Sequence, residues 1–345
     1  MAHVVSRGVS RLPAWPEGFG LMEAQMRTAE LKQLLAMTRR LTPNQREELV
    51  AQLSEGMARD EVGAVIQDKL ARHPGCPRCA GQHTVRNGQA SGLQRYKCRG
   101  CGLSFNALTG TPLARLRGRD KWFEQVQVMD EGLSVRKSAA RMAVHRTTAF
   151  RWRHRFLALP REVKAHQLSG VAEGDETYVL RSYKGQQRRL LAETARKPRH
   201  RGGKAAKRGL SAEQVPILVL RNRAGQTTDS VLEASNKPCV TETLKPALAE
   251  DAVLCTDGSG LLATAAAELG IEHRAVNATR GERVRGPWHI QNVNAYHSRF
   301  KGWLQRFKGV ATSYLPNYLG WFRALDRNVQ SGAKPIALLA LAIGA

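Results

Sequence analysis

The fold is decided by the segment Gly170-Val-Ala-Glu-Gly-Asp-Glu-Thr-Tyr178, which places Asp175 inside a run of strand-forming residues. A carboxylate inside an apolar strand costs free energy unless a partner holds it. A second such run, Ala252-Val-Leu-Cys-Thr-Asp257-Gly-Ser-Gly260, ends on another acid, and the glycines after it permit a tight turn. We therefore expect Asp175 and Asp257 at the ends of neighbouring strands. Two carboxylates placed in this way suit a site for two Mg²⁺ ions.

Working outward from this segment, strand-type runs occur at 171–180, 215–220 and 252–255, and helical stretches alternate with the later ones. This order favours an α/β layer over residues 168–327. The preceding residues have a different character, with helical patterns on both sides of a cysteine-rich segment. The expected fold class is therefore multidomain α+β.

Four cysteines form two tight pairs, Cys76-Pro-Arg-Cys79 and Cys98-Arg-Gly-Cys101, separated by eighteen residues. Each pair can turn two thiolates onto one metal ion, and two such pairs close a tetrahedral site. The spacing predicts a zinc ribbon with one structural Zn²⁺ per chain. Four unrelated buried thiols are the alternative, which leaves the Pro and Gly inside the pairs unexplained. The other cysteines, Cys239 and Cys255, are expected to be core or surface residues.

Residues 119–160 read as three helices. The first covers 121–131, Ser134 can cap the second, and the third runs over 146–157 after a turn at 142–145. A helix-turn-helix that binds DNA is one interpretation, and a plain three-helix bundle with a charged face is the other. The candidate DNA-contacting residues of the ribbon and the third helix are Arg86, Arg95, Lys97, Arg146, Arg151, Arg153 and Arg155.

The whole chain is strongly basic, with 54 Lys and Arg against 29 Asp and Glu in 345 residues, a net charge of +25. Such a charge repels itself and indicates a polyanionic partner, usually nucleic acid. The loop 184–209 is the most basic segment, and we expect it to neutralise phosphates or to be solvated. Its candidate DNA contacts are Arg199, Arg201, Lys204, Lys207 and Arg208.

Several classes of protein are disfavoured by the sequence. The residues 1–20 carry charges where a secretory signal needs an apolar core. The longest apolar run, 336–343, is too short to cross a bilayer. Paired cysteines in a long chain indicate bound metal in a reducing compartment. We therefore expect a cytoplasmic protein without a membrane partner.

The N-terminal region shows no chemistry. Residues 22–70 read as packing or interaction helices, with a helix start at Thr42 and Pro43. The expected domains are an N-terminal helical region, a zinc ribbon, a helix-turn-helix domain, a catalytic domain and a C-terminal tail, with the bounds 1–73, 74–112, 113–165, 168–327 and 328–345.

Between Gly75 and Trp321 the chain resembles the bacterial insertion-sequence transposases that join a zinc ribbon to a DDE-type catalytic domain. The resemblance rests on ordered blocks rather than on one motif. These blocks are the two cysteine pairs, Arg86-Asn-Gly88, Leu103-Ser-Phe105, Thr109-Gly-Thr-Pro112, Gly174-Asp-Glu-Thr-Tyr178, Arg196-Lys-Pro-Arg199, Arg208-Gly-Leu-Ser211, Thr256-Asp-Gly258, the segment 289–304 and Tyr314-Leu-Pro-Asn-Tyr-Leu-Gly-Trp321.

The resemblance implies a ribonuclease H-like catalytic domain and a third ligand on a late helix, with a basic residue seven positions further on. Asn294 and Lys301 occupy these two places. Seven residues make about two helical turns, so both side chains share one face. Asn offers a carbonyl oxygen to Mg²⁺ but no charge, and this departure from three acids leaves Glu282 as the alternative ligand.

For function, the resemblance implies a transposase that binds terminal inverted repeats and performs Mg²⁺-dependent strand cleavage and strand transfer. Its partners would be the repeats, the target DNA and at least one further copy of the chain on paired ends, near the bacterial nucleoid. A non-catalytic DNA-binding regulator or an inactive, domesticated transposase fits the ribbon and the charge equally well. An RNA-binding ribbon protein is a third possibility.

Overall fold

The computed structural model describes residues 26–194, 205–206, 211–276, 281 and 283–345. Its contacts divide the chain into two units, residues 1–57 and 58–345, and each unit is described by itself. None of the helices in the described part of the chain is both long and apolar enough to cross a membrane.

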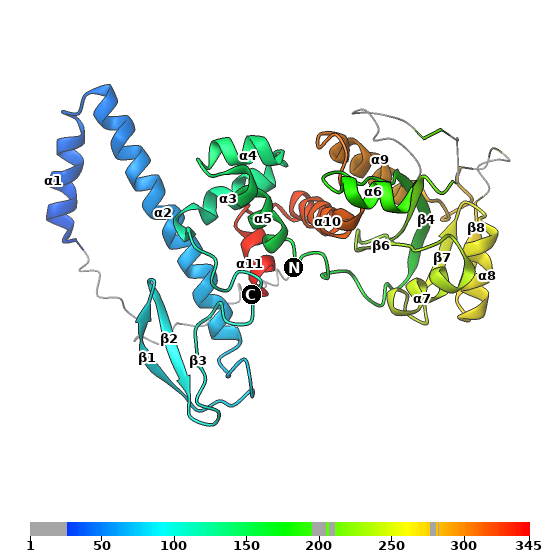
Figure 1. Ribbon diagram of the computed structural model, residues 1–345, viewed down its shortest axis with the longest axis horizontal. Helices are drawn as coiled ribbons and strands as arrows, with labels where there is room; N and C mark the ends of the chain where they lie inside the picture. Colours follow the sequence, from blue (N-terminus) through cyan, green and yellow to red (C-terminus); the bar gives the residue numbers. More distant parts are fainter. Residues whose placement is uncertain (1–25, 195–204, 207–210, 277–280, 282) are drawn as a thin grey trace, which may run out of the picture. The chain divides into compact units, whose positions relative to one another are not determined.

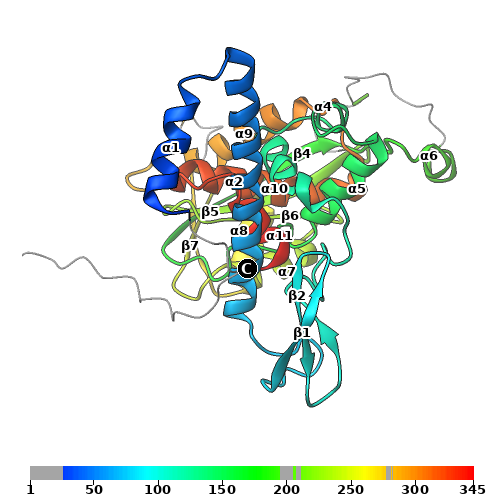
Figure 2. The ribbon, with the colours of Figure 1, turned by 90° about the vertical axis from the view of Figure 1, so that its left-hand side faces the viewer.

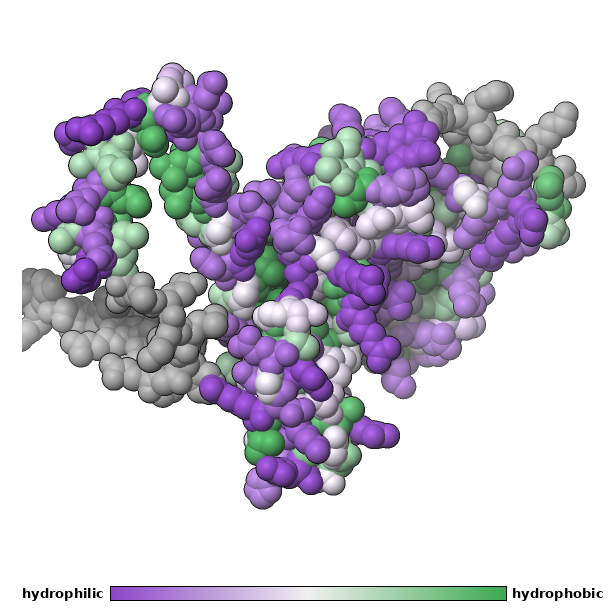
Figure 3. All heavy atoms as spheres, turned by 60° about the vertical axis from the view of Figure 1, so that its left-hand side comes forward, coloured by the Kyte–Doolittle hydropathy of each residue, from purple (hydrophilic) through white to green (hydrophobic). Residues whose placement is uncertain are grey.

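The first unit is an antiparallel helical hairpin of α1 (Thr28–Thr38) and the first half of α2 (Pro43–Arg72) (Figures 1 and 2). The start of α2 is where the sequence predicts it. The Thr42 hydroxyl faces the Gln45 N–H at 3.4 Å, and the Thr42 N–H donates to the Gln45 side chain, which is a capping box. Apolar side chains lie on the sides of the two helices that face each other (Figure 3). The exposed large apolar residues of this unit include Leu31, Leu34, Leu35, Val50, Leu53 and Met57.

The second unit begins with the rest of α2 and a three-stranded antiparallel sheet of β1 (Thr84–Ala90), β2 (Leu93–Cys98) and β3 (Ser104–Phe105). The β1–β2 hairpin turns on Ser91 and Gly92, which have φ of 51° and 68°. Two successive positive φ values are those of a type I′ turn, which matches the twist of the strands. This sheet holds the cysteine pairs together.

Three short helices follow: α3 (Trp122–Asp130), α4 (Val135–Arg141) and α5 (Arg146–Phe156), with the 3-10 turn η1 (Arg119–Lys121) before them. All three lie where the sequence predicts them. The Ser134 hydroxyl accepts from the Lys137 N–H, and the His145 Nδ1 accepts from the Thr147 N–H at the start of α5. A small core of Val128, Ala139, Met142 and Ala149 joins the helices.

The largest part of the second unit is a five-stranded mixed sheet in the order β6-β5-β4-β7-β8. β4 lies at its centre and pairs antiparallel with β5 and parallel with β7. The sheet thus confirms the predicted mixed, ribonuclease H-like layer. The strands are β4 (Val171–Leu180), β5 (Gln214–Asn222), β6 (Thr227–Val231), β7 (Val253–Thr256) and β8 (Glu272–Ala275).

Helices cover both faces of this sheet (Figure 1). On one face, α7 (Lys237–Ala247) and α8 (Gly260–Glu268) pack over Ala172, Leu220 and Leu254. On the other face, the main core contains residues of α9 (Gln291–Gln305) and α10 (Leu315–Ser331) together with Val215, Ile217 and Val219 of β5. The remaining elements are α6 (Gln187–Glu193), η3 (Thr312–Tyr314) and α11 (Ala337–Ile343).

The main core also extends to residues of α3 and α5 and to Val62 and Ile66 of α2. The indole N–H of Trp321 on α10 donates to the Met129 carbonyl of α3 over 3.0 Å. The segment 328–345, expected to be a tail, contains the end of α10 and all of α11, whose Leu338 and Leu339 are buried in this core.

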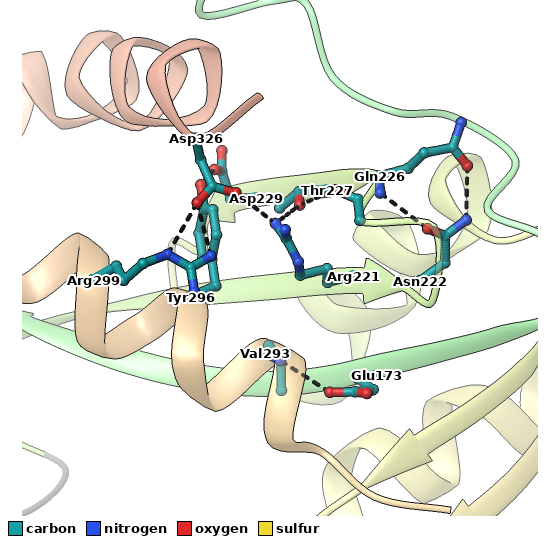
Figure 4. Close-up of polar contacts among 11 residues, drawn as sticks. Glu173, Arg221, Asn222, Gln226, Thr227, Asp229, Val293, Tyr296, Arg299 and Asp326 are labelled. Carbon is teal, nitrogen blue, oxygen red and sulfur yellow. Dashed lines mark hydrogen bonds and ion pairs between the residues drawn. The ribbon is translucent and has the colours of Figure 1, made fainter. Parts of the chain in front are cut away.

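A buried polar network fixes α9 and α10 against the β5–β6 side of the sheet (Figure 4). On α9, Tyr296 donates to Asp229 of β6 over 2.9 Å. On α10, Asp326 accepts from Arg221 of β5 and from Arg299 of α9. Buried charges of this kind are tolerated only when each is paired, so the network specifies where the two helices lie.

Gly320 on α10 packs directly against the backbone of residues 160 and 161. A Cβ at this position would lie 2.4 Å from the Arg161 Cα and 2.7 Å from the Pro160 carbonyl oxygen. We expect Gly320→Ala to destabilise the fold by about 1–3 kcal/mol through overpacking against backbone. Thermal unfolding followed by circular dichroism measures this change.

Gly302 on α9 provides the matched control, because nothing lies within 4 Å of a Cβ built there. Gly302→Ala should stabilise the helix by about 0.5–1 kcal/mol, since alanine loses less backbone entropy than glycine. A melting temperature of Gly320→Ala equal to that of the wild type would show that the α10 contact is looser than described.

Candidate functional site

The two predicted catalytic acids lie on β4 and directly after β7, and these two strands are adjacent and parallel. Glu173 of β4 is paired with Cys255 of β7. Two residues further along the chain lie Asp175, which is still on β4, and Asp257, which is the first residue after β7. Neighbouring strands lie about 4.8 Å apart. The pairing therefore places the backbone of Asp175 and of Asp257 near the same end of β7.

Each of these carboxylates is held by one oxygen. The Asp175 Oδ1 accepts from the Glu176 N–H over 2.8 Å, and the Asp257 Oδ1 accepts from the Ser259 N–H over 3.0 Å. The turn after β7 depends on Gly258, whose φ is +93°. Asp257 is exposed and the Asp175 side chain is 21 % exposed, so a cation can reach both. Carboxylate oxygens in this setting are the ligand type that Mg²⁺ prefers.

The alternation along β4 explains how it carries acids without losing its core. Its even-numbered residues face the α7–α8 side, where a Cβ on Gly174 would lie 2.9 Å from Leu254 and 3.0 Å from Leu220. Glycine lets these leucines close over the strand. The odd-numbered residues Glu173 and Asp175 face α9 instead, and this face carries the polar chemistry.

Asn294 and Lys301 both lie on α9 and are exposed. Each helical residue turns the side chain by about 100°, so the two lie about 20° apart around the axis. Tyr296, about 140–160° away from them, contacts Asp229 on β6. Asn294 and Lys301 therefore lie on an exposed side of α9 that differs from the side contacting β6.

A buried acid that sequence reasoning missed, Glu173, lies beside this site. It is fully buried and accepts from the Val293 N–H and from the Asn292 side chain, each over 2.9 Å. Its third partner is Arg223, which also contacts His289. The signal was present in the sequence, because Glu173 is an acid inside an apolar strand on the same face as Asp175.

The four arginines of the third helix, α5, differ in how far they are exposed to solvent. Arg146 and Arg151 are exposed. Arg153 is only 1 % exposed, stacks 4.9 Å from the Trp321 ring and donates to the Leu133 carbonyl. Arg155 donates to the carbonyls of Pro112 and Ala114.

The structure therefore does not support a DNA contact by Arg153, because its guanidinium is buried among the aromatic residues that join α5 to α10. The Arg155 side chain links α5 to the backbone of the segment that precedes α3, through the carbonyls of Pro112 and Ala114. In the ribbon, Arg86 and Lys97 are exposed, whereas Arg95 is half-buried and donates to the Ser104 hydroxyl over 2.9 Å.

Several predicted residues lie outside the described residues. Glu282, the alternative third ligand, is one of them. The candidate DNA contacts of the basic loop are the others: Arg199, Arg201, Lys204, Lys207 and Arg208. Their roles stay predictions.

The four ribbon cysteines come together as a group that can hold a metal ion. Their Sγ atoms all lie within 4.8 Å of one another, with 3.5 Å between Cys76 and Cys101 and 3.6 Å between Cys79 and Cys98. A tetrahedral zinc site with Zn–S bonds of about 2.3 Å places its sulfurs about 3.8 Å apart. The observed separations are close to that value, so zinc fits the group.

Backbone N–H groups in the two cysteine turns favour the thiolate form that a metal binds. At Cys98, the Cys101 N–H lowers the pKa despite burial. At Cys76, burial raises the pKa, but the N–H groups of Cys79 and Arg78 offset it and lower the pKa to about 7. Two of the four ligands are thus prepared to lose a proton.

We expect about one zinc ion per chain in freshly purified protein, measured by elemental analysis. Replacing a ligand, as in Cys98→Ser, should abolish this zinc and unfold the ribbon, since a segment of this size cannot make its own core. Cys239→Ser is the control, because Cys239 lies on α7 outside the group. Zinc-free protein, or full zinc content in Cys98→Ser, would refute the assignment.

Residues 167–323, which include the five-stranded sheet, match a transposase domain family. That family is the ISXO2-like transposase domain. Over 252 residues the chain is 29 % identical to an "Uncharacterized protein in transposable element ISH50" from Halobacterium salinarum, covering 72 % of this chain and 83 % of the relative. Residues 167–323 thus match a transposase domain, and the chain is similar to a protein of a transposable element; a bacterial origin stays a prediction.

One solved structure, the "Crystal structure of a pre-cleavage Mos1 transpososome", also matches the chain. The sequences are 11 % identical, the match covers 62 % of this chain and 79 % of that chain, and the TM-score is 0.21. A likeness at this TM-score carries no argument about fold or function.

Proposed function

We propose that the protein is an active DNA transposase that cleaves the ends of its element and joins the freed 3′ ends to target DNA. The observation that supports this proposal is the parallel pairing of β4 with β7 up to Glu173 and Cys255, with Asp175 and Asp257 each two residues further along the chain. The transposase family of the surrounding residues supports it. A DNA-binding regulator would have no need for two accessible acids so arranged.

In this proposal, Asp175 and Asp257 hold two Mg²⁺ ions, and Asn294 adds its carbonyl oxygen from α9. The ions, when bound, would activate the attacking hydroxyl and stabilise the leaving oxygen of an in-line displacement at phosphorus. Lys301 lies about two turns beyond Asn294 on the same face and would contact a DNA phosphate. The β4–β7 edge and α9 together would thus orient the scissile strand.

DNA recognition is assigned to the ribbon and to α3–α5, over the proposed domains 74–112 and 113–165. The exposed Arg86, Lys97, Arg146 and Arg151 would contact the terminal repeats. The basic loop 184–209 would add affinity that is independent of sequence. Because a transposase must cut two ends together, we propose at least a dimer on paired ends, acting on DNA in the cytoplasm.

The experiment is a cleavage assay on DNA that carries the element's terminal inverted repeats. We expect strand-specific nicking at the repeat ends in Mg²⁺ or Mn²⁺, and loss of nicking in EDTA or with scrambled repeats. Specific binding to the repeats without any cleavage in either metal would favour the non-catalytic regulator. Preferential binding of RNA over duplex DNA in competition would favour an RNA-binding protein.

A further inference from the structure

Two contacts join α9 to the acid-bearing face of β4. At the start of the helix, Glu173 accepts from the Val293 N–H over 2.9 Å. One turn later, the His297 Nδ1 lies 3.5 Å from the Asp175 Oδ2. Asn294 stands on the turn between these two contacts.

The spacing between the two contacts is nearly the same along β4 as along α9. From Glu173 to Asp175 a strand advances about 6.6 Å, because each residue rises about 3.3 Å. From Val293 to His297 a helix advances about 6 Å, at 1.5 Å per residue. The near equality lets α9 run alongside β4 in the same direction and make both contacts without bending.

Both residues are buried where burial is costly. Glu173 is fully buried, and its charge is compensated by Arg223 and by the N–H groups at the positive end of the α9 dipole. The His297 side chain is 8 % exposed, and its Nε2 has no hydrogen-bond partner among the described residues. Burying a histidine with one unpartnered nitrogen costs free energy. Packing alone therefore does not explain His297, whereas its Nδ1 contact with Asp175 indicates a role.

We propose that Glu173 and His297 are positioning residues, which fix α9 and the Asp175 carboxylate so that Asn294 is presented to the same metal ions. This inference rests on the proposed function of Asp175 and Asn294. Glu173 sets where α9 begins, and His297 orients the Asp175 oxygen that its backbone contact leaves available. Groups that orient a ligand in this way typically change metal affinity by about 10–100-fold when removed.

The test measures Mn²⁺ binding to the full-length protein by electron paramagnetic resonance, beside cleavage and thermal unfolding. We expect His297→Leu to weaken Mn²⁺ binding at least tenfold and to lose cleavage that added Mn²⁺ restores. His297→Asn should keep near wild-type affinity, because its Nδ2 can take the place of the His Nδ1 as donor. If His297→Leu does not fold, His297→Phe keeps the ring without a donor.

Glu173→Gln tests the second contact, since glutamine still accepts from the Val293 N–H but lacks the charge. It should remain folded and bind Mn²⁺ several-fold more weakly. The control is His166→Leu, an exposed histidine before β4, which should bind Mn²⁺ as the wild type does.

The outcomes separate the inference from the function. If Asp175→Asn abolishes Mn²⁺ binding while folded His297→Leu and Glu173→Gln bind it normally, the positioning inference is overturned and the proposed function stands. Equal losses in His297→Asn and His297→Leu would also overturn it for His297, because the donor would be irrelevant. If Asp175→Asn binds Mn²⁺ as the wild type does, the proposed function itself fails.

Discussion

Asp175→Asn and Asp257→Asn are each expected to abolish cleavage and strand transfer while leaving binding to the terminal repeats unchanged. The substitution keeps the size of the side chain and the acceptor for the Glu176 or Ser259 N–H, so the fold should persist. It removes the charge that holds the metal ion. Metal ions supply several kcal/mol to such reactions, so a loss of about a thousandfold or more is expected.

Cleavage of labelled terminal DNA in single-turnover conditions measures this effect, and gel-shift titration measures binding. Asp251→Asn is the matched control, because Asp251 is an exposed acid at the other end of β7. Wild-type cleavage by either Asp175→Asn or Asp257→Asn would contradict the site. Loss of DNA binding together with cleavage would place these acids in the DNA interface or the fold instead.

The strands that the sequence predicted are those that contain a continuous run of apolar residues. β4, β5 and β7 lie at the predicted positions because each contains a run of residues that prefer strands. β6, Thr227–Val231, was missed because its residues are mostly polar and its acid Asp229 is buried. Asp229 is paired with Arg323 of α10 and Tyr296 of α9, and no local pattern reveals such tertiary partners.

The same limit applies to single side chains. In α5, Arg151 and Arg153 belong to one basic run, and composition alone makes them equivalent. The 3.6-residue period places Arg153 near Ala149, Phe150 and Phe156 rather than on the polar face, but a buried guanidinium is too rare to expect without its aromatic partners. The Trp321 ring that covers Arg153 is far away in sequence.

Some residues of the candidate site could be assigned from the sequence, and others could not. Asp175 and Asp257 were predicted as ligands because each interrupts or ends an apolar run, and this role stays a prediction. Glu173 and His297 were not assigned, because their roles depend on where α9 crosses β4. Asn294 carries no charge to mark it, and only the resemblance to known transposases singled it out.

Asn294→Ala is expected to cripple cleavage, by about a hundredfold or more, if the Asn294 carbonyl oxygen is a metal ligand. Removing one ligand weakens metal binding and frees the scissile phosphate to shift. Asn294→Asp should keep activity, because it restores an oxygen of the same reach and adds charge. Asn294→Glu should work less well, since one more methylene moves the oxygen further than a metal site tolerates.

The series is read from single-turnover cleavage rates over a range of Mg²⁺ concentrations, with Ser298→Ala as control. Ser298 is exposed one turn further along α9 on the same face, so Ser298→Ala shows what a change on this face that removes no proposed metal ligand does to cleavage. Full activity of Asn294→Ala with a dead Glu282→Ala would make Glu282 the third ligand and displace the assignment of α9. If both variants are active, the two aspartates hold the ions alone or together with another residue, and Asn294 would then serve only as a surface amide on α9.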